Sequence, residues 1–118
     1  MPKNQYTDQG RRLRALARDT SVQFRWTRHA LEEMNSDNIT RNDVRTVLRK
    51  GLVIRVESNR YEETWNCLGI DLDERKIEIV VVANENELSI KVITAWKKRN
   101  GEYAGSRVWD FKGRKSAA

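Results

Sequence analysis

The chain has 118 residues, 38% of them hydrophobic and 34% charged, and its formal net charge is +6 at pH 7. This length suits a single domain over residues 1–118, and the lone cysteine, Cys67, excludes an intramolecular disulfide and a multi-cysteine metal site. No segment resembles a signal peptide or a membrane-spanning helix, so we expect a cytoplasmic protein without membrane contact. Basic ends flank an acidic middle at 51–83, which suits either a polyanionic partner or simple solubility.

Two helices are expected in the first part of the chain. Leu13, Leu16 and Ala17 recur at helical spacing, which predicts an amphipathic helix over 8–18. Thr27 is a suitable N-cap for a second helix, because a threonine side chain accepts a hydrogen bond from the free backbone N–H groups of a first turn.

A third helix follows the turn-forming cluster at 35–38. Thr40 and Asp43 have the spacing of a capping box. The apolar stripe of this helix consists of Val44, Val47 and Leu48. Gly51 stands where a helix C-terminus favours a left-handed residue.

After Gly51 the apolar pattern becomes extended. Strands are predicted at Leu52–Glu57, Tyr61–Ile70 and 77–82. A fourth strand is expected to place one set of alternating residues on a single face: Leu88, Ile90, Val92, Thr94 and Trp96. The short connections favour an antiparallel meander.

The end of the chain is less patterned. Arg99-Asn100-Gly101 reads as a turn, and residues 108–111 are expected to add an edge strand or to pack across the sheet. Residues 112–118 are expected to be a flexible tail. The elements together predict an α+β domain in which two to three helices pack on one face of a four-stranded antiparallel sheet.

His29 is the single histidine of the chain, with arginines before it and carboxylates after it. Histidine side chains act as acid and base near neutral pH. On a helical wheel His29 lies away from the apolar cluster of Ala30, Leu31 and Met34, so it is not expected in the core. Glu33, one turn later, can orient the imidazole. The alternative is a surface histidine without a role.

Several site classes have too few residues of the required type. One histidine and one distant cysteine are too few for a zinc site, and no paired acidic motif proposes magnesium. Glycine-rich phosphate loops and nucleophile motifs are absent from the sequence. We therefore expect no metal and no cofactor, which leaves acid–base chemistry.

Basic side chains recur along the third predicted helix. Arg41, Arg45 and Arg49 are spaced by four residues, and Lys50 extends their stripe. A second cluster, Lys97-Lys98-Arg99, ends the fourth strand. Such stripes bind phosphate backbones in a salt-sensitive way, although a solvated helix face has the same pattern.

Two tryptophans lie on predicted strands beside basic residues. Trp65 and Trp96 have the surroundings of residues that stack the bases of single-stranded RNA. Tryptophan on a strand is, however, more commonly a core residue. Both interpretations stay open at this point.

The ordered set of segments resembles the domain-of-unknown-function 4258 family over about residues 24–97. The matching segments are Trp26–Glu32, Ile39–Val44, Trp65–Gly69, Ile79–Val82 and Val92–Trp96. That family is similar to a branch of the RelE/barnase/EndoU/colicin-type nucleases. The resemblance implies a RelE-like fold and a toxin-type, metal-independent ribonuclease that is commonly paired with an antitoxin. It makes His29 the catalytic group of the helix and Thr94 its companion on a strand.

Three functions are compatible with the sequence. In the first, the protein is an endoribonuclease acting on single-stranded or ribosome-associated RNA, with His29 as acid or base and Thr94 on a phosphate oxygen. Arg28, with Arg60 or Lys97, would stabilise the charge on the phosphorane. The second is a non-catalytic nucleic-acid-binding module. The third is a protein-interaction domain whose basic surface serves solubility.

Overall fold

A computed structural model describes residues 5–98 as three helices and one five-stranded sheet. The order of strands across the sheet is β1-β5-β4-β3-β2. In chain order the elements are α1 (Thr7–Arg18), β1 (Gln23–Trp26), α2 (Arg28–Ser36), α3 (Arg41–Lys50), β2 (Leu52–Ser58), β3 (Glu63–Ile70), β4 (Lys76–Asn84) and β5 (Ser89–Lys97).

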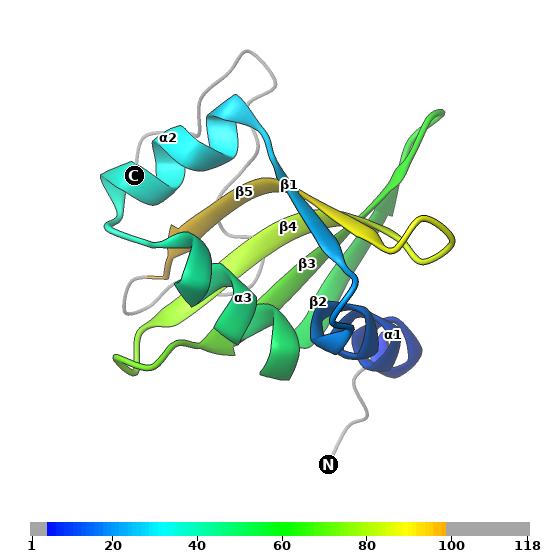
Figure 1. Ribbon diagram of the computed structural model, residues 1–118, viewed down its shortest axis with the longest axis horizontal. Coiled ribbons are helices and arrows are strands. Elements are labelled where there is room, and N and C mark those ends of the chain that lie inside the picture. The colour runs from blue at the N-terminus through cyan, green and yellow to red at the C-terminus, as the bar shows by residue number, and fades with distance from the viewer. Residues whose placement is uncertain (1–4, 99–118) are drawn as a thin grey trace.

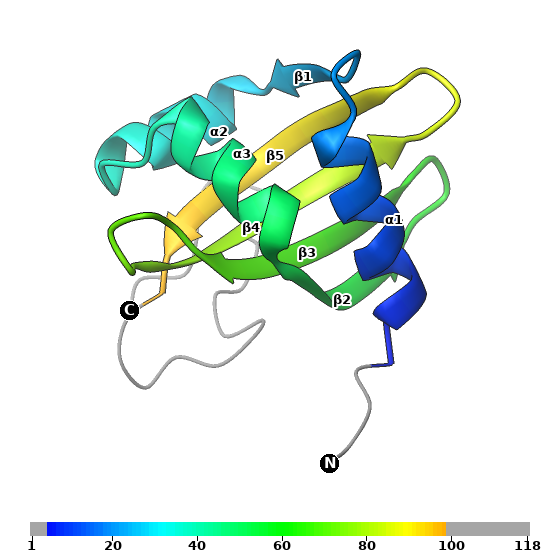
Figure 2. The same cartoon turned by 60° about the horizontal axis from the view of Figure 1, so that its bottom comes forward.

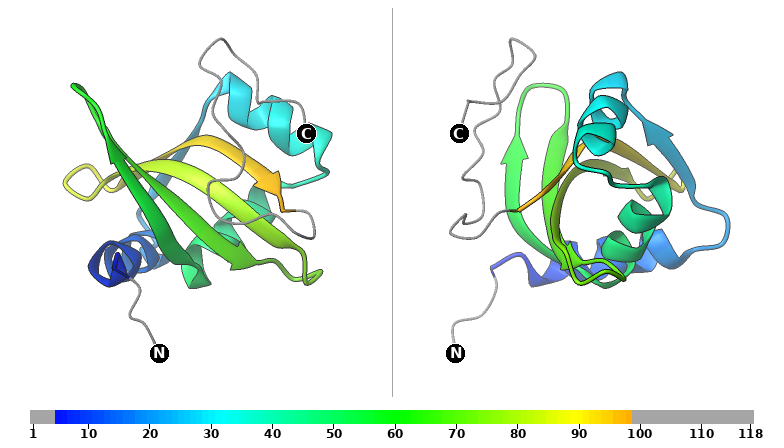
Figure 3. Two further views of the ribbon diagram at one scale, coloured as in Figure 1. Left: turned by 180° about the vertical axis from the view of Figure 1, so that it is seen from behind. Right: turned by 90° about the vertical axis from the view of Figure 1, so that its left-hand side faces the viewer.

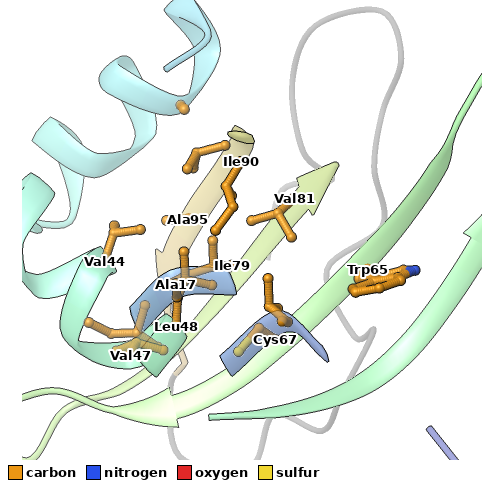
Figure 4. Packing of buried hydrophobic residues seen from close by; sticks show 14 of the residues in the cluster. Ala17, Val44, Val47, Leu48, Trp65, Cys67, Ile79, Val81, Ile90 and Ala95 are labelled. Atoms are coloured by element: carbon orange, nitrogen blue, oxygen red, sulfur yellow. The ribbon is translucent and has the colours of Figure 1, made fainter. Parts of the chain in front are cut away.

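The helices α1 and α3 lie on one face of the sheet, and α2 lies along β5 (Figures 1 and 2). The hydrophobic core fills the space between α1, α3 and the sheet (Figure 4). Its helix side includes Leu13, Val44 and Leu48, and its sheet side includes Cys67 and Ile79. Seen from behind, the opposite face of the sheet stands in front of the helices (Figure 3). The predicted α+β class is confirmed.

The predicted helix starts are confirmed by their hydrogen bonds. Thr40 Oγ1 accepts from the Asp43 backbone N–H at 3.0 Å, and Asp43 Oδ2 accepts from the Thr40 backbone N–H at 2.8 Å, so the capping box is complete. Thr27 Oγ1 caps α2 by accepting from the Ala30 backbone N–H at 3.0 Å.

The prediction of four antiparallel strands was wrong in one respect, because the sheet has a fifth strand that makes it mixed. β1 pairs in parallel with β5, and Gln23 lies opposite Ser89. This strand of four residues was missed in the sequence, although its side chains alternate between polar and apolar. Parallel pairing with a strand more than 60 residues later adds no local turn signal.

The predicted face of the last strand was also wrong. Val92 lies opposite Val81, but Thr94 lies opposite Val80, so Ile93 is an extra residue in a β-bulge. The bulge reverses the alternation along β5. Ile90 and Val92 therefore point into the core, whereas Thr94 and Trp96 point to the opposite face of the sheet.

Smaller corrections concern the ends of elements. Leu88 is not part of the strand, which begins at Ser89, and its φ of 51° places it in a left-handed turn. Gly51 has φ −74° and ψ 177°, so it is extended and not left-handed. β3 begins at Glu63 instead of Tyr61, because Asn59 Oδ1 accepts from the backbone N–H groups of Tyr61 and Glu62 in a turn.

Some expectations concern residues outside the described range. The turn at 99–101, the edge strand at 108–111 and the flexible tail at 112–118 all lie beyond residue 98. Within residues 5–98, no helix is both long and apolar enough to cross a membrane.

Candidate functional site

Helix α2 is fastened to β5 at both of its ends. Thr27, its N-cap, donates its hydroxyl hydrogen bond to the Ile93 carbonyl at 2.9 Å. Asp37, its C-cap, accepts a hydrogen bond from the Lys97 backbone N–H through Oδ2 at 2.8 Å. The helix therefore lies beside the second half of β5, where β1 no longer pairs with it.

This attachment brings the neighbourhoods of His29 and Thr94 together. His29 follows Thr27 by two residues in the first turn of α2, and Thr94 directly follows Ile93. His29 is half-buried, as expected for a residue outside the core, and Thr94 is fully buried. The Thr94 hydroxyl makes no hydrogen bond within the described residues.

The sheet face that carries Thr94 holds a buried polar cluster. Glu78 is 0% exposed, accepts a hydrogen bond from the Asn66 amide at 2.8 Å and forms an ion pair with Lys98 at 3.2 Å. Trp96 lies opposite Glu78 in the ladder and is 2% exposed. We call Asn66, Glu78, Thr94, Trp96 and Lys98 the polar sheet face. They lie on β3, β4, the end of β5 and the residue that follows it, away from the helix-packed core.

The other two expected catalytic residues have exposed positions. The Arg28 side chain is 93% exposed and lies 3.5 Å from Glu32 across one turn of α2. Arg60 is exposed in the connection between β2 and β3. Its neighbour Glu62 pairs with Lys91 of β5 at 3.2 Å. Arg28 and Arg60 therefore belong to different ends of the fold, at α2 and at the β2–β3 hairpin.

Neither strand tryptophan offers an open ring. Trp65 is 5% exposed in the main core, where its indole N–H donates to Glu63 at 2.6 Å and Arg12 lies 5.3 Å from the ring centroid. A hydrogen bond with Glu85 raises the pKa of Arg12 and lowers that of Glu85. With Trp96 also buried, the expectation that Trp65 and Trp96 stack bases is corrected: both are packed side chains.

The basic residues at the end of β5 differ in their exposure to solvent. Lys97 is exposed, but Lys98 is buried against Glu78, so its ammonium is not displayed to a phosphate. Arg99 lies outside the described residues. Lys50 is exposed beside an apolar hollow that also involves Leu52 and Ile70, apart from the arginine stripe.

The arginine stripe of α3 lies against two aromatic rings of β1. The guanidinium of Arg41 is 5.5 Å from the Trp26 ring centroid, and that of Arg45 is 5.2 Å from Phe24 and 5.7 Å from Trp26. The two rings are stacked with centroids 5.9 Å apart. We call Phe24, Trp26, Arg41, Arg45 and Arg49 the basic aromatic surface.

Sequence reasoning found the arginines of this surface but missed its rings. Phe24 and Trp26 are half-buried, while Gln23 before them and Arg25 between them are exposed. This period of two was a usable signal for a short strand. What the sequence did not contain was the pairing with β5 that sets these rings beside α3.

No three His, Cys, Asp or Glu side chains within residues 5–98 gather closely enough to hold a metal ion. Cys67, the single cysteine, is buried in the core, and this burial raises the pKa of its thiol to about 12. It is therefore a packing residue in this part of the chain.

These features define a small α+β domain with a basic aromatic surface on its helical side and a polar cluster on the opposite sheet face. The model of the family described as domain of unknown function (DUF4258) matches residues 26–97, from the end of β1 to the end of β5. The chain belongs to this family. No curated protein matched the sequence.

Proposed function

We propose that the protein binds single-stranded RNA through the basic aromatic surface. The observation that carries this proposal is the placement of the Arg41 and Arg45 guanidinium groups over the stacked rings of Phe24 and Trp26. RNA-binding proteins use aromatic rings and guanidinium planes to stack unpaired bases.

Charge adds to this proposal. Arg41, Arg45 and Arg49 follow one side of α3, while Val44, Val47 and Leu48 of the same helix are buried. A line of guanidinium groups neutralises successive phosphates and releases counterions, which gives affinity that falls with salt. The bases would add stacking that depends little on sequence. The predicted ligand is thus a short unpaired segment and not a particular base sequence.

A polarisation assay with a fluorescent single-stranded RNA tests this function. The wild-type protein should bind at low salt, and the Arg41→Gln/Arg45→Gln variant should bind at least about tenfold more weakly. The matched control is Arg11→Gln/Arg55→Gln, which removes the same charge from α1 and β2. Equal loss in both variants would show that only net charge matters and would contradict the proposal.

A second candidate function is metal-independent cleavage of RNA beside α2, in a RelE-like toxin fold. It is favoured by the bond from Thr27 to Ile93, which sets the first turn of α2, with His29, beside the strand segment that carries Thr94. His29 would exchange a proton with the ribose 2′-hydroxyl or the leaving oxygen. Because Thr94 is fully buried, it would support the strand segment beside α2 and would not itself bind a phosphate oxygen. An antitoxin is the partner that such an activity would require.

Cleavage of RNA in the presence of a chelator tests this second candidate. The wild-type protein should cut the RNA, and His29→Ala should remain folded and inactive. Asn35→Ala, on an exposed position of the same helix, is the control that should stay active. Cleavage that persists in His29→Ala, or that disappears with the chelator alone, would contradict this mechanism.

A further inference from the structure

A hollow of about 450 Å³ adjoins the basic aromatic surface. It lies where the last turn of α1, the segment leading into β1, and α3 meet. Its basic lining consists of Arg18, Arg45 and Arg49, and its apolar wall includes Val22 and Phe24. A volume of this size lies within the range of sites for small organic ligands.

Two of these arginines hold the helix ends together. Arg18 Nε donates to the Arg49 carbonyl at 2.9 Å, and Arg49 Nε donates to the Ala17 carbonyl at 3.4 Å. Each arginine thus caps the C-terminal end of the other helix, where backbone carbonyls lack partners within the helix. These two hydrogen bonds hold the Nε end of each guanidinium group in place at the helix ends.

The capping bonds use only some of the hydrogen-bond donors of these two arginine side chains. A guanidinium has five N–H donors, and Arg18 and Arg49 each use the Nε donor in the bonds described. Both side chains are exposed, and both line the hollow. The Arg45 Cζ atom lies 5.2 Å from the Phe24 ring centroid, and a cation–π contact of this kind does not use the N–H groups as hydrogen-bond donors to a carbonyl.

The charge of the lining favours an anion with several oxygens. The lining contains three guanidinium groups and one carboxylate, that of Asp19. Its Oδ1 already accepts a hydrogen bond from the Ser21 backbone N–H at 2.7 Å. Forked guanidinium donors match phosphate oxygens in pairs, which an isolated ammonium does not. The hollow is larger than a phosphate, and the Phe24 wall suits the sugar or base attached to it.

We infer that this hollow is a subsite for the phosphate of a nucleotide, with Arg18, Arg45 and Arg49 as its donors and Phe24 beside the nucleoside. The inference deepens the proposed RNA-binding function and rests on it for the identity of the larger ligand. The phosphate comes either from an internal phosphodiester of bound RNA or from a terminal monoester. Both present anionic oxygens to the arginines, and the terminal monoester carries the larger negative charge.

The first experiment compares adenosine 5′-monophosphate with adenosine by NMR titration of the full chain. The monophosphate should shift the signals of the lining residues, and adenosine should bind at least about tenfold more weakly. Arg45→Lys/Arg49→Lys keeps the charge but removes the forked donors, and it should lose most of the preference for the monophosphate. Arg11→Lys/Arg55→Lys is the matched control that should keep it. Equal binding of adenosine and its monophosphate would overturn the inference.

The second experiment uses one RNA with and without a 5′-phosphate. Tighter binding of the phosphorylated RNA, lost in Arg45→Lys/Arg49→Lys, identifies a terminal monoester, whereas equal binding that weakens in the same variant identifies an internal phosphodiester. RNA binding that is unchanged in this variant, yet lost in Arg41→Gln, would overturn the subsite and leave the RNA function standing. Monophosphate binding without RNA binding would support the subsite and contradict the RNA function.

Discussion

The hydroxyl of Thr27 joins α2 to the carbonyl of Ile93 at 2.9 Å, at the one residue of β5 that stands in a bulge. The same hydroxyl caps α2, since it accepts from the Ala30 backbone N–H. The residues of β5 before Ile93 pair with β1, and the residues after Ile93 lie beside α2. The Thr27 side chain therefore lies where the chain passes from β1 to α2. It also lies where the bulge in β5 reverses which side chains point into the core.

Replacement of Thr27 by alanine should destabilise the fold. The variant loses the cap of α2 and the bond to Ile93, and loss of an N-cap alone costs about 0.5–2 kcal/mol. Thr27→Ser keeps the hydroxyl and should retain most of the free energy of unfolding. Urea denaturation followed by circular dichroism measures both variants. Equal stability of the two would show that the hydroxyl contributes nothing.

Cys67 should not react with thiol reagents in the folded protein. The side chain is 0% exposed, and burial raises its thiol pKa to about 12, so the reactive thiolate is rare at neutral pH. Labelling with a chromogenic disulfide should be slow in buffer and fast in denaturant. Rapid stoichiometric labelling of the native chain at pH 7 would contradict the packing described for β3.

Acid should destabilise the link between the β3–β4 turn and α3. Although burial raises the pKa of Asp71, hydrogen bonds from the backbone and guanidinium of Arg75 outweigh it, and the net pKa lies below the ordinary 3.8. The carboxylate therefore adds stability above that ordinary value, and this stability is lost as the pH falls through the lowered folded pKa. Each unit of difference is worth about 1.4 kcal/mol.

The acid effect depends on Arg75, which also contacts Asp43 and the Asn38 carbonyl. In Arg75→Gln the Asp71 carboxyl should titrate at a higher pH, as followed by carbon-detected NMR. Arg55→Gln, which breaks an exposed pair with Glu57, should leave that titration unchanged. An Asp71 titration that is the same in all three proteins would contradict this assignment.

Gly51 should not tolerate a side chain. Its φ is ordinary, but an added Cβ would lie 2.7 Å from Cys67 Sγ and 2.8 Å from the Leu68 carbonyl oxygen. Such overpacking typically costs about 1–3 kcal/mol. Gly10→Ala is the control, because its closest neighbour is the flexible Arg14 guanidinium at 3.1 Å and alanine favours a helix. Denaturation should show loss in Gly51→Ala and little change in Gly10→Ala.

The sequence was sufficient for the elements that local chemistry determines. The caps at Thr27 and Thr40 and the buried stripe with Val44 and Val47 depend on neighbours three or four residues away, so spacing revealed them. The meander from β2 to β5 has short connections, and its antiparallel pairing was predicted for the same reason.

What the sequence did not reveal depends on distant pairing. β1 is a strand because residues near position 90 provide its partner, and the rings of Phe24 and Trp26 reach Arg41 and Arg45 through that pairing. The bulge at Ile93 has no local signal, yet it moved Thr94 and Trp96 to the opposite face. The arginine stripe was visible in the sequence, but its aromatic half was not.

The most direct test of the RNA-binding proposal is an amide NMR map of the protein titrated with a short single-stranded RNA at low salt. The shifted signals should belong to β1, α3 and the end of α1, and the shifts should become smaller as the salt concentration rises. Shifts confined to α2 and the polar sheet face, or no shifts at any salt concentration, would contradict the proposal.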